Sequence, residues 1–158
     1  MPAGVSSPAL LGDAVYVAGG AFGGTGRVTA LNRTTGAFLW SYEPNGPIQA
    51  SVAAADGTVY VSTNTAQGTI YALNATTGRL RWSFTPSPAQ YILGSPVVAD
   101  GVLFAPSDNG HVYAFRDPPG SVTGFLSLSN PVVLIILIVA VTTVAVGIVA
   151  SIRRSRRA

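Results

Sequence analysis

Short segments of alternating apolar and polar residues recur at a constant spacing along the first two thirds of the chain. Each segment opens with a glycine, and the three glycines, Gly26, Gly68 and Gly110, are 42 residues apart. Alternation with a period of two is typical of β-strands with one buried face. Two further strands precede each segment, and the turns between them are predicted at Gly12-Asp13, Asp56-Gly57 and Asp100-Gly101. A period of about 40 residues made of short strands is typical of β-propeller blades.

Two copies of the repeat share a second motif. The strings TALNRTTGAFLW (Thr29–Trp40) and YALNATTGRLRW (Tyr71–Trp82) both contain an Asn-x-Thr-Thr-Gly turn followed by a tryptophan. Asn and Thr side chains bond local backbone in such turns, and Gly36 and Gly78 can adopt the left-handed conformation. The motif therefore predicts the turn between the third and fourth strands of a blade.

Strict alternation assigns the side chains around this turn to two faces. In the second copy it places Tyr71 and Leu73 on one face of the third strand and Ala72 on the other. In the fourth strands it groups Leu80 with Trp82 and Phe84, and Phe38 with Trp40 and Tyr42. These aromatic faces are predicted to pack against the adjacent blade.

The pattern A-L-N-x-T-T-G-x-x-x-W resembles the tryptophan-bearing repeat of pyrroloquinoline-quinone (PQQ)-type propellers. That family includes quinoprotein alcohol dehydrogenases and the non-enzymatic outer-membrane assembly lipoprotein. The resemblance covers about residues 5–117 and implies that Trp40 and Trp82, with Gly36 and Gly78, dock neighbouring blades. It implies the fold and leaves the function open, because catalytic and scaffolding members share the repeat.

The expected fold is all-β, with about three four-stranded antiparallel blades in residues 1–117. The blades are predicted at about residues 5–43, 47–85 and 91–117, and the third lacks a T-G-x-x-x-W strand after Arg116. We therefore expect its fourth strand to be missing. Three blades form only a partial β-propeller, and the chain begins in mid-pattern. The expectation is the C-terminal part of a longer propeller protein; the alternative is a short protein that closes a ring as a homo-oligomer.

The apolar character of the chain is concentrated at its C-terminal end. Hydrophobic residues make up 48% of the chain and charged residues only 9%, and residues 131–152 contain no charge. A helix of this length spans the hydrocarbon core of a bilayer, which is about 30 Å thick. We predict a single C-terminal transmembrane α-helix at 131–152. The alternative is a buried helix of a soluble domain.

Membrane topology is predicted from a short basic tail. Residues 153–158 contain four of the nine basic residues, namely Arg153, Arg154, Arg156 and Arg157. Basic residues beside a span stay in the cytoplasm, so the propeller is predicted to be extracytoplasmic, joined to the span by a Pro/Gly/Ser stalk at 118–130. No export signal is evident near Met1, which again favours a longer protein. A cleaved C-terminal sorting signal is the alternative reading of the stalk, span and tail.

Candidate chemistry is sparse. There is no cysteine and one histidine, His111, and five Asp and one Glu are scattered along the sequence. The Gly-rich run Gly19–Gly26 lacks the following Lys-Ser/Thr of a phosphate-binding loop, and a flexible loop is expected there. No catalytic, cofactor-binding or metal-binding residue is predicted. Asn32 and Asn74 match the N-glycosylation pattern, although the turn alone accounts for both residues.

The predicted function is that of a membrane-anchored, extracytoplasmic binding or scaffold module without catalytic activity. Its expected partners are the lipid bilayer and a protein or envelope polymer, without nucleic acid, because the basic charge is confined to the tail. No cofactor is expected in this reading. The alternative is the C-terminal part of a membrane-bound PQQ-dependent dehydrogenase. The resemblance then implies PQQ and calcium, with the catalytic residues upstream.

Overall fold

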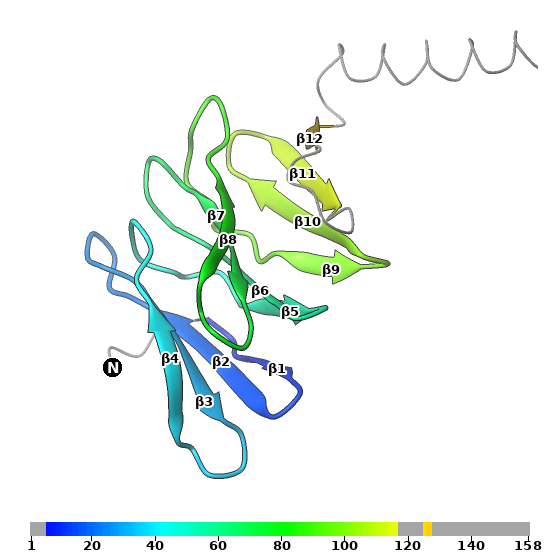
Figure 1. The fold of residues 1–158 in the computed structure, drawn as a ribbon. Helices are drawn as coiled ribbons and strands as arrows, with labels where there is room; N and C mark the ends of the chain where they lie inside the picture. The colour runs from blue at the N-terminus through cyan, green and yellow to red at the C-terminus, as the bar shows by residue number, and fades with distance from the viewer. Residues whose placement is uncertain (1–5, 117–124, 128–158) are drawn as a thin grey trace, which may run out of the picture.

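The computed structural model describes residues 6–116 and 125–127, which form three four-stranded antiparallel sheets (Figure 1). Blade 1 contains β1 (Ala9–Leu11), β2 (Ala14–Gly19), β3 (Arg27–Asn32) and β4 (Phe38–Tyr42). Blade 2 contains β5 (Ala53–Ala55), β6 (Thr58–Ser62), β7 (Ile70–Asn74) and β8 (Leu80–Phe84). Blade 3 contains β9 (Val97–Ala99), β10 (Val102–Ser107), β11 (His111–Arg116) and β12 (Phe125–Ser127). The predicted all-β class with four-stranded antiparallel sheets is confirmed for this part of the chain.

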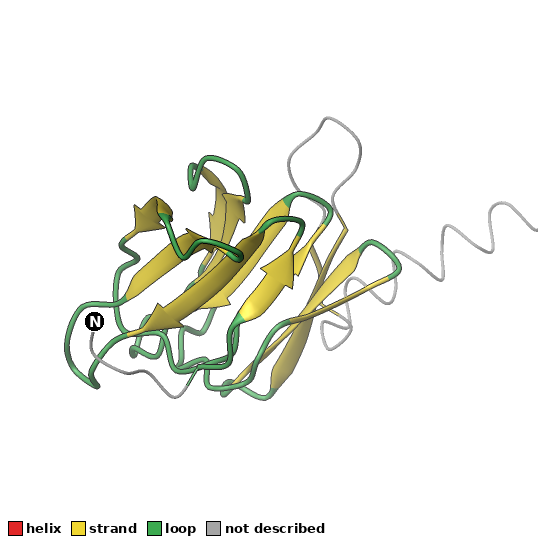
Figure 2. Cartoon of the chain, turned by 90° about the horizontal axis from the view of Figure 1, so that it is seen from below, coloured by secondary structure: helices red, strands yellow, loops and turns green. Residues whose placement is uncertain are grey.

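The strands of each sheet follow one another in chain order, and the three sheets lie side by side like blades (Figure 1). The first strands are neighbours, since β1 lies beside β5 and β5 beside β9. All the regular elements of the described chain are strands joined by loops and turns (Figure 2). The connections gather at two ends of the blades. We call the end with residues 12–13, 33–37, 56–57, 75–79 and 100–101 the turn end, and the other the loop end.

The hairpins between the first two strands of each blade fall where the sequence predicted them. Asp56 and Gly57 both have positive φ angles, 50° and 71°, as do Asp100 and Gly101 at 50° and 70°. Positive φ at both central residues is the pattern of a type I′ turn, which matches the twist of the flanking strands. Gly12 has φ 58°, and a glycine at the first central position is the pattern of a type II′ turn.

Blade 2 is buried on both faces because each of its neighbours covers one. Tyr71 and Leu73 of β7 belong to the core shared with blade 1, whereas Ile70 and Ala72 belong to the core shared with blade 3. The predicted assignment of Tyr71, Ala72 and Leu73 to alternate faces is therefore confirmed. Strands buried on both faces read as continuous apolar runs, which explains why I-Y-A-L shows little polar alternation.

The predicted grouping of fourth-strand side chains is wrong at one position in each copy. Ala72 pairs with Trp82 but Leu73 pairs with Leu80, so a β-bulge at Arg81 shifts the register. Paired residues share a face, and Leu80 therefore lies on the opposite face from Trp82. Blade 1 has the same bulge, at Leu39, which separates Phe38 from Trp40. The bulges could not be predicted from the sequence, because apolar residues still alternate along both strands despite the extra residue in each.

The prediction that blade 3 lacks a fourth strand is also wrong. β12 pairs antiparallel with β11 at the outer edge of the sheet, within the segment predicted as a stalk. Its register places Leu126 opposite Ala114, as Trp82 lies opposite Ala72 in blade 2. The repeat motif did not reveal β12 because β12 lacks the motif's tryptophan. Backbone pairing with β11 requires only an extended segment.

Several predicted segments lie outside the described residues. They are the transmembrane helix at 131–152, the basic tail at 153–158 and most of the stalk at 118–130. Within residues 6–116 and 125–127, no helix is long and apolar enough to cross a membrane. The span therefore stays a prediction from the sequence.

The two-sided core of blade 2 gives a matched pair of substitutions. Leu73 is fully buried, whereas Leu80, its partner across β7 and β8, is 46% exposed. We expect Leu73→Ala to lower the free energy of unfolding by about 2–5 kcal/mol. Leu80→Ala should lower it by about 1 kcal/mol or less. Urea denaturation measures both losses, and equal losses would contradict the placement of Leu73 in the core.

Candidate functional site

Trp40 lies at the boundary between blades 1 and 2 and makes the most specific contact between them. Its indole Nε1 donates a hydrogen bond of 2.8 Å to the carbonyl oxygen of Ala75, in the turn after β7. The hydroxyl of Tyr16 donates to the same oxygen at 3.2 Å. The two rings pack together, with centroids 5.7 Å apart. One carbonyl has two acceptor lone pairs, so a single oxygen of blade 2 holds two aromatic side chains of blade 1.

The turn that presents this carbonyl is fixed by its own sequence. The Asn74 Oδ1 accepts hydrogen bonds from Thr76 N at 3.0 Å, Thr77 N at 2.9 Å and Thr77 Oγ1 at 3.1 Å. Gly78 N donates to Asn74 O at 2.8 Å and closes the turn. Such Asx-type bonds satisfy backbone donors locally. The turn therefore holds the Ala75 carbonyl in place independently of the neighbouring blade.

Position 78 requires a glycine for two reasons, its backbone conformation and the close approach of Trp40. Its φ is 70°, a value that residues with a Cβ rarely adopt. A Cβ at this position would also lie 2.6 Å from the Cδ2 and Cε3 atoms of Trp40. The indole therefore rests directly against the glycine backbone. The tryptophan of the first copy of the motif thus contacts the Thr-Thr-Gly turn of the second copy, in the next blade.

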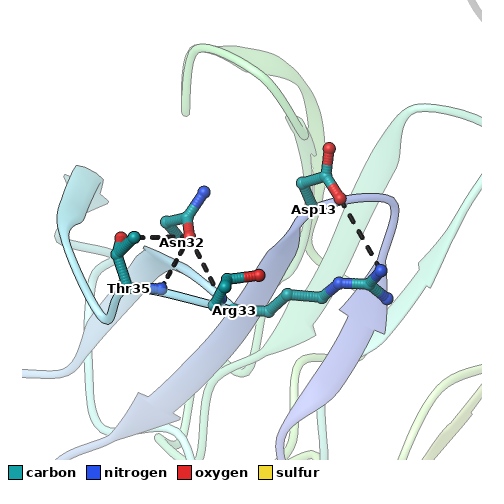
Figure 3. Close-up of polar contacts among 5 residues, drawn as sticks. Asp13, Asn32, Arg33 and Thr35 are labelled. Carbon is teal, nitrogen blue, oxygen red and sulfur yellow. Dashed lines mark hydrogen bonds and ion pairs between the residues drawn. The ribbon is translucent and has the colours of Figure 1, made fainter.

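The first copy of the turn has the same geometry but no covering tryptophan (Figure 3). The Asn32 Oδ1 accepts from Thr34 N at 3.0 Å, Thr35 N at 2.9 Å and Thr35 Oγ1 at 3.0 Å. Gly36 also has φ 70°, and no atom of the described residues lies within 4 Å of a Cβ built on it. The neighbouring Arg33 forms an exposed ion pair with Asp13 at 3.7 Å. The turn therefore keeps the same conformation without a tryptophan packed against it.

Trp82 does not repeat the contact of Trp40. It is only partly buried, and its ring lies 5.1 Å from that of Phe115 and 6.1 Å from that of Tyr60. In the described part of the chain its indole N–H has no hydrogen-bond acceptor. The repeat positions of Asn74 to Gly78 are occupied by R-D-P-P-G in the third copy, residues 116–120, of which the structure describes only Arg116. Blades 2 and 3 therefore meet through an aromatic cluster.

A polar network at the loop end was missed by the sequence reasoning. The Asn45 Oδ1 accepts from the Thr63 hydroxyl at 2.8 Å, and the Asn45 Nδ2 donates to the Thr69 hydroxyl at 3.2 Å. The hydroxyls of Thr69 and Thr85 are 2.8 Å apart. These bonds join the loop after blade 1 to blade 2. The sequence signal was the cluster of Thr and Asn in S-T-N-T-A-Q-G-T, which resembles an ordinary polar loop.

The recurring glycine that revealed the repeat also has a packing role. A Cβ on Gly68 would lie 2.8 Å from the Ile92 Cγ1, and the Gly68 N–H donates to the carbonyl of Gln90 at 3.1 Å. The backbone just before β7 can therefore approach the loop before blade 3 closely. Gly110, in contrast, has nothing within 4 Å of its added Cβ.

The remaining candidate residues do not form a reactive group. His111 is partly buried, and its Nδ1 lies 3.0 Å from the Asn109 carbonyl oxygen. Asp13, Asp56 and Asp100 occupy hairpins of three different blades. Among residues 6–116 and 125–127, no three His, Asp or Glu side chains could hold a metal ion together. Outside the described residues lie the four topology residues Arg153, Arg154, Arg156 and Arg157.

Burial perturbs two tyrosines at the contact between blades 1 and 2. Removal from water raises the pKa of Tyr16, because the phenolate is poorly solvated there. The pKa of Tyr42 is raised mainly by burial and additionally by the phenol of Tyr71, whose ring centroid is 5.8 Å away. The neutral forms of both side chains are therefore part of the packed interface.

Comparison with known proteins identifies the repeat. Residues 24–123 match the family model described as outer membrane protein assembly factor BamB. BamB from Moraxella catarrhalis has 27% identity and a TM-score of 0.57, covering 77% of this chain and 36% of that structure. No protein of curated function matches the chain.

Dehydrogenases share the fold. A europium-containing methanol dehydrogenase has 23% identity and a TM-score of 0.58, covering 76% of this chain and 24% of its own. The quinohemoprotein alcohol dehydrogenase from Comamonas testosteroni has 25% identity and a TM-score of 0.57, covering 72% of this chain and 19% of its own. The present chain thus spans between 19% and 36% of the length of these three structures.

The two turn glycines give a matched test of the Trp40 contact. We expect Gly36→Ala to cost about 1–2 kcal/mol of unfolding free energy, from backbone strain alone. Gly78→Ala should cost about 1–3 kcal/mol more, because the new methyl group also displaces the indole. Urea denaturation followed by tryptophan fluorescence measures both values. Identical losses would show that Trp40 does not rest on Gly78.

The raised pKa values of Tyr16 and Tyr42 predict a loss of stability at high pH. A raised pKa means that the folded state holds the phenol proton more tightly than the unfolded state does. The contribution of these tyrosines to the unfolding free energy is therefore complete below the ordinary tyrosine pKa of 10.0 and is lost as the pH rises above that value. We expect the unfolding free energy to decrease between about pH 9 and pH 11. Tyr16→Phe combined with Tyr42→Phe should flatten this decrease, and Tyr91→Phe, which removes an exposed phenol, serves as the control. An unchanged slope in the double variant would refute the assignment.

Proposed function

We propose, from the premise that this chain belongs to the outer membrane protein assembly factor BamB family, that it is a non-catalytic binding module. In this proposal the propeller blades form a rigid support whose loops contact a protein or an envelope polymer. The 27% identity to a BamB structure supports a role of this kind. A rigid support with variable loops is a common arrangement for recognition.

The observation that carries the proposal is a set of exposed apolar side chains on the loop end. Phe22 is 71% exposed at the Gly-rich loop after β2, and Leu93 is 52% exposed in the loop before β9. Tyr91, in the same loop, is 37% exposed. Large aromatic and aliphatic residues are enriched in the centres of protein interfaces. The loop end therefore offers the chemistry of a protein-binding surface.

Anchoring in a membrane is a further part of the proposal. The 22 uncharged residues at 131–152 and the four arginines that follow support one span with a cytoplasmic C-terminus and an extracytoplasmic propeller. The chain covers 36% of the BamB structure, which supports a longer protein with further blades. The loop end would then face partners of the envelope close to the membrane surface.

The second candidate function is the C-terminal part of a membrane-bound PQQ-dependent dehydrogenase. The likeness to the quinohemoprotein alcohol dehydrogenase favours it. The described residues do not fit a calcium-bound quinone, because they bring no three acidic or histidine ligands together. In this alternative the residues that hold PQQ and calcium belong to other parts of a longer protein.

A crosslinking experiment separates the two functions. A photoreactive amino acid at position 22 or 93, in the protein within its own membranes, should link to one discrete partner. The same probe at Thr76, exposed at the turn end, is the control and should give no such product. Equal labelling from all three positions would contradict the binding surface. Calcium-dependent uptake of PQQ with dye reduction by an alcohol would instead establish the dehydrogenase.

A further inference from the structure

We propose that the loop before blade 3, residues 85–96, rests in the headgroup region of a lipid bilayer and fixes the orientation of the blades above the membrane. The inference rests on the proposed membrane anchor, and it adds a contact with lipid to the proposed binding of a protein or polymer partner. Three observations support it. They are the direction in which the chain leaves blade 3, the side chains that this loop exposes, and the distribution of charge between the two ends of the blades.

The chain leaves blade 3 at the loop end. β11 runs from the loop end to the turn end, and β12 pairs antiparallel with it and ends at Ser127, opposite Tyr113. The last described strand therefore points towards the loop end. Only residues 128–130 separate Ser127 from the uncharged run at 131–152. The predicted span thus begins close to the loop end of blade 3.

The length of this connection limits the distance between blade 3 and the bilayer. The chain from Ser127 to Pro131 spans at most about 14 Å when fully extended. The headgroup region on each side of the hydrocarbon core is about 5–8 Å thick. β11 reaches from Tyr113 to His111, about 7 Å further towards the loop end than the residue opposite Ser127. The loops of blade 3 at this end are therefore within reach of the headgroups.

Hydrogen bonds hold residues 85–96 beside the point where the chain leaves. The Asn109 Nδ2 donates to the hydroxyl of Tyr113 at 2.9 Å and to the carbonyl of Pro88 at 3.0 Å. Tyr113 is the residue opposite Ser127. The loop and the end of β12 therefore lie at the same end of blade 3.

The loop before blade 2 is the structural equivalent of this loop and serves as a comparison. Asn64 N donates to the carbonyl of Pro47 at 2.8 Å, and Asp108 N donates to the carbonyl of Tyr91 at 3.1 Å. Donors and acceptors are both 44 residues apart. Position 91 therefore corresponds to position 47, and position 93 to position 49.

The two loops differ in the side chains at these positions. Pro47 is fully buried, and the Gln49 Oε1 accepts a hydrogen bond from the Asn64 Nδ2 at 2.6 Å. The corresponding Tyr91 is 37% exposed and Leu93 52% exposed. Tyrosine is enriched at the interface between membrane and water, and apolar side chains such as leucine bind there by burial. The loop beside the predicted span thus exposes interfacial residues that the repeat itself does not require.

Charge is concentrated at the opposite, turn end. Residues 85–96 contain no charge, and the described loop end carries Asp108 together with the ion pair of Arg27 and Glu43. Charged groups are costly to bring close to hydrocarbon, so the loop end is the face that can approach a bilayer. The other seven of the ten Arg, Asp and Glu residues that the structure describes lie at the turn end, namely Asp13, Arg33, Asp56, Arg79, Arg81, Asp100 and Arg116.

Single-cysteine labelling tests the proposal, because the native sequence has no cysteine. The full chain with Gln90→Cys, labelled with the fluorophore NBD, is reconstituted in phosphatidylcholine vesicles. Lipids with a nitroxide on the headgroup should reduce its fluorescence about twofold, because the label then lies at the depth of the headgroups. The same label at Thr76, exposed at the turn end, is the control and should keep its fluorescence. An unquenched label at position 90 would overturn the proposal.

Two double variants separate the loop from exposed apolar residues in general. Tyr91→Ser with Leu93→Ser should remove most of the quenching at position 90. Leu10→Ser with Leu80→Ser removes two side chains that are 65% and 46% exposed elsewhere and should leave the quenching unchanged. The same result from both double variants would show that the loop has no specific role.

The vesicle composition identifies the occupant. These vesicles contain no other protein, so a protein partner cannot shield position 90. A signal that grows with the ratio of protein to lipid would identify a second copy and overturn the proposal. Replacing part of the phosphatidylcholine by phosphatidylglycerol should not strengthen the quenching, because the loop end has no excess of basic residues to attract anionic lipid. Stronger quenching there would contradict docking by apolar contact.

Flotation of the vesicles distinguishes this proposal from those on which it rests. A chain that does not float with the vesicles would overturn both the membrane anchor and the lipid contact. A chain that floats with an unquenched label at position 90 would overturn the lipid contact alone. Crosslinking from position 22 in native membranes tests the binding function separately, and that function can fail while the quenching is observed.

Discussion

The contact of the Trp40 indole with the Asn74–Gly78 turn is the constraint on which the arrangement of blades 1 and 2 depends. It combines a hydrogen bond to the Ala75 carbonyl, a close approach to Gly78 and a second donor from Tyr16. Hydrophobic burial between two sheets is non-directional and tolerates many relative orientations. The hydrogen bond and the steric contact select one of them. Burial of the apolar faces stabilises the pair of sheets, and the Trp40 contact fixes the rotation of one sheet relative to the other.

The sequence predicted the repeat and the turn end of the fold well because local chemistry decides both. Asn32 and Asn74 form the same Asx bonds to within 0.1 Å of one another. Neither turn needs a tertiary partner to form. Positive φ at Asp56 and Asp100 likewise follows from the residue types at a two-residue hairpin.

Other parts of the fold could not be read from the pattern. The bulges at Leu39 and Arg81 insert one residue without changing the apolar alternation, and only the pairing register reveals them. β12 lacks the tryptophan by which the other fourth strands were recognised. The network around Asn45 joins residues from two blades, and a single sequence does not show which polar loop residues will meet. Each of these features depends on contacts between distant segments.

The direction of the Trp40 contact also bears on the order in which the protein folds during synthesis. The indole of blade 1 precedes its acceptor, the Ala75 carbonyl, by 35 residues. The N-terminal residues leave the ribosome first. Trp40 therefore emerges before the turn that contains its acceptor has been synthesised. The Trp40 indole can therefore form its hydrogen bond only after the next repeat has been synthesised. This contact can therefore form only about one repeat behind translation, and until then the indole has neither its acceptor nor the glycine surface that buries it.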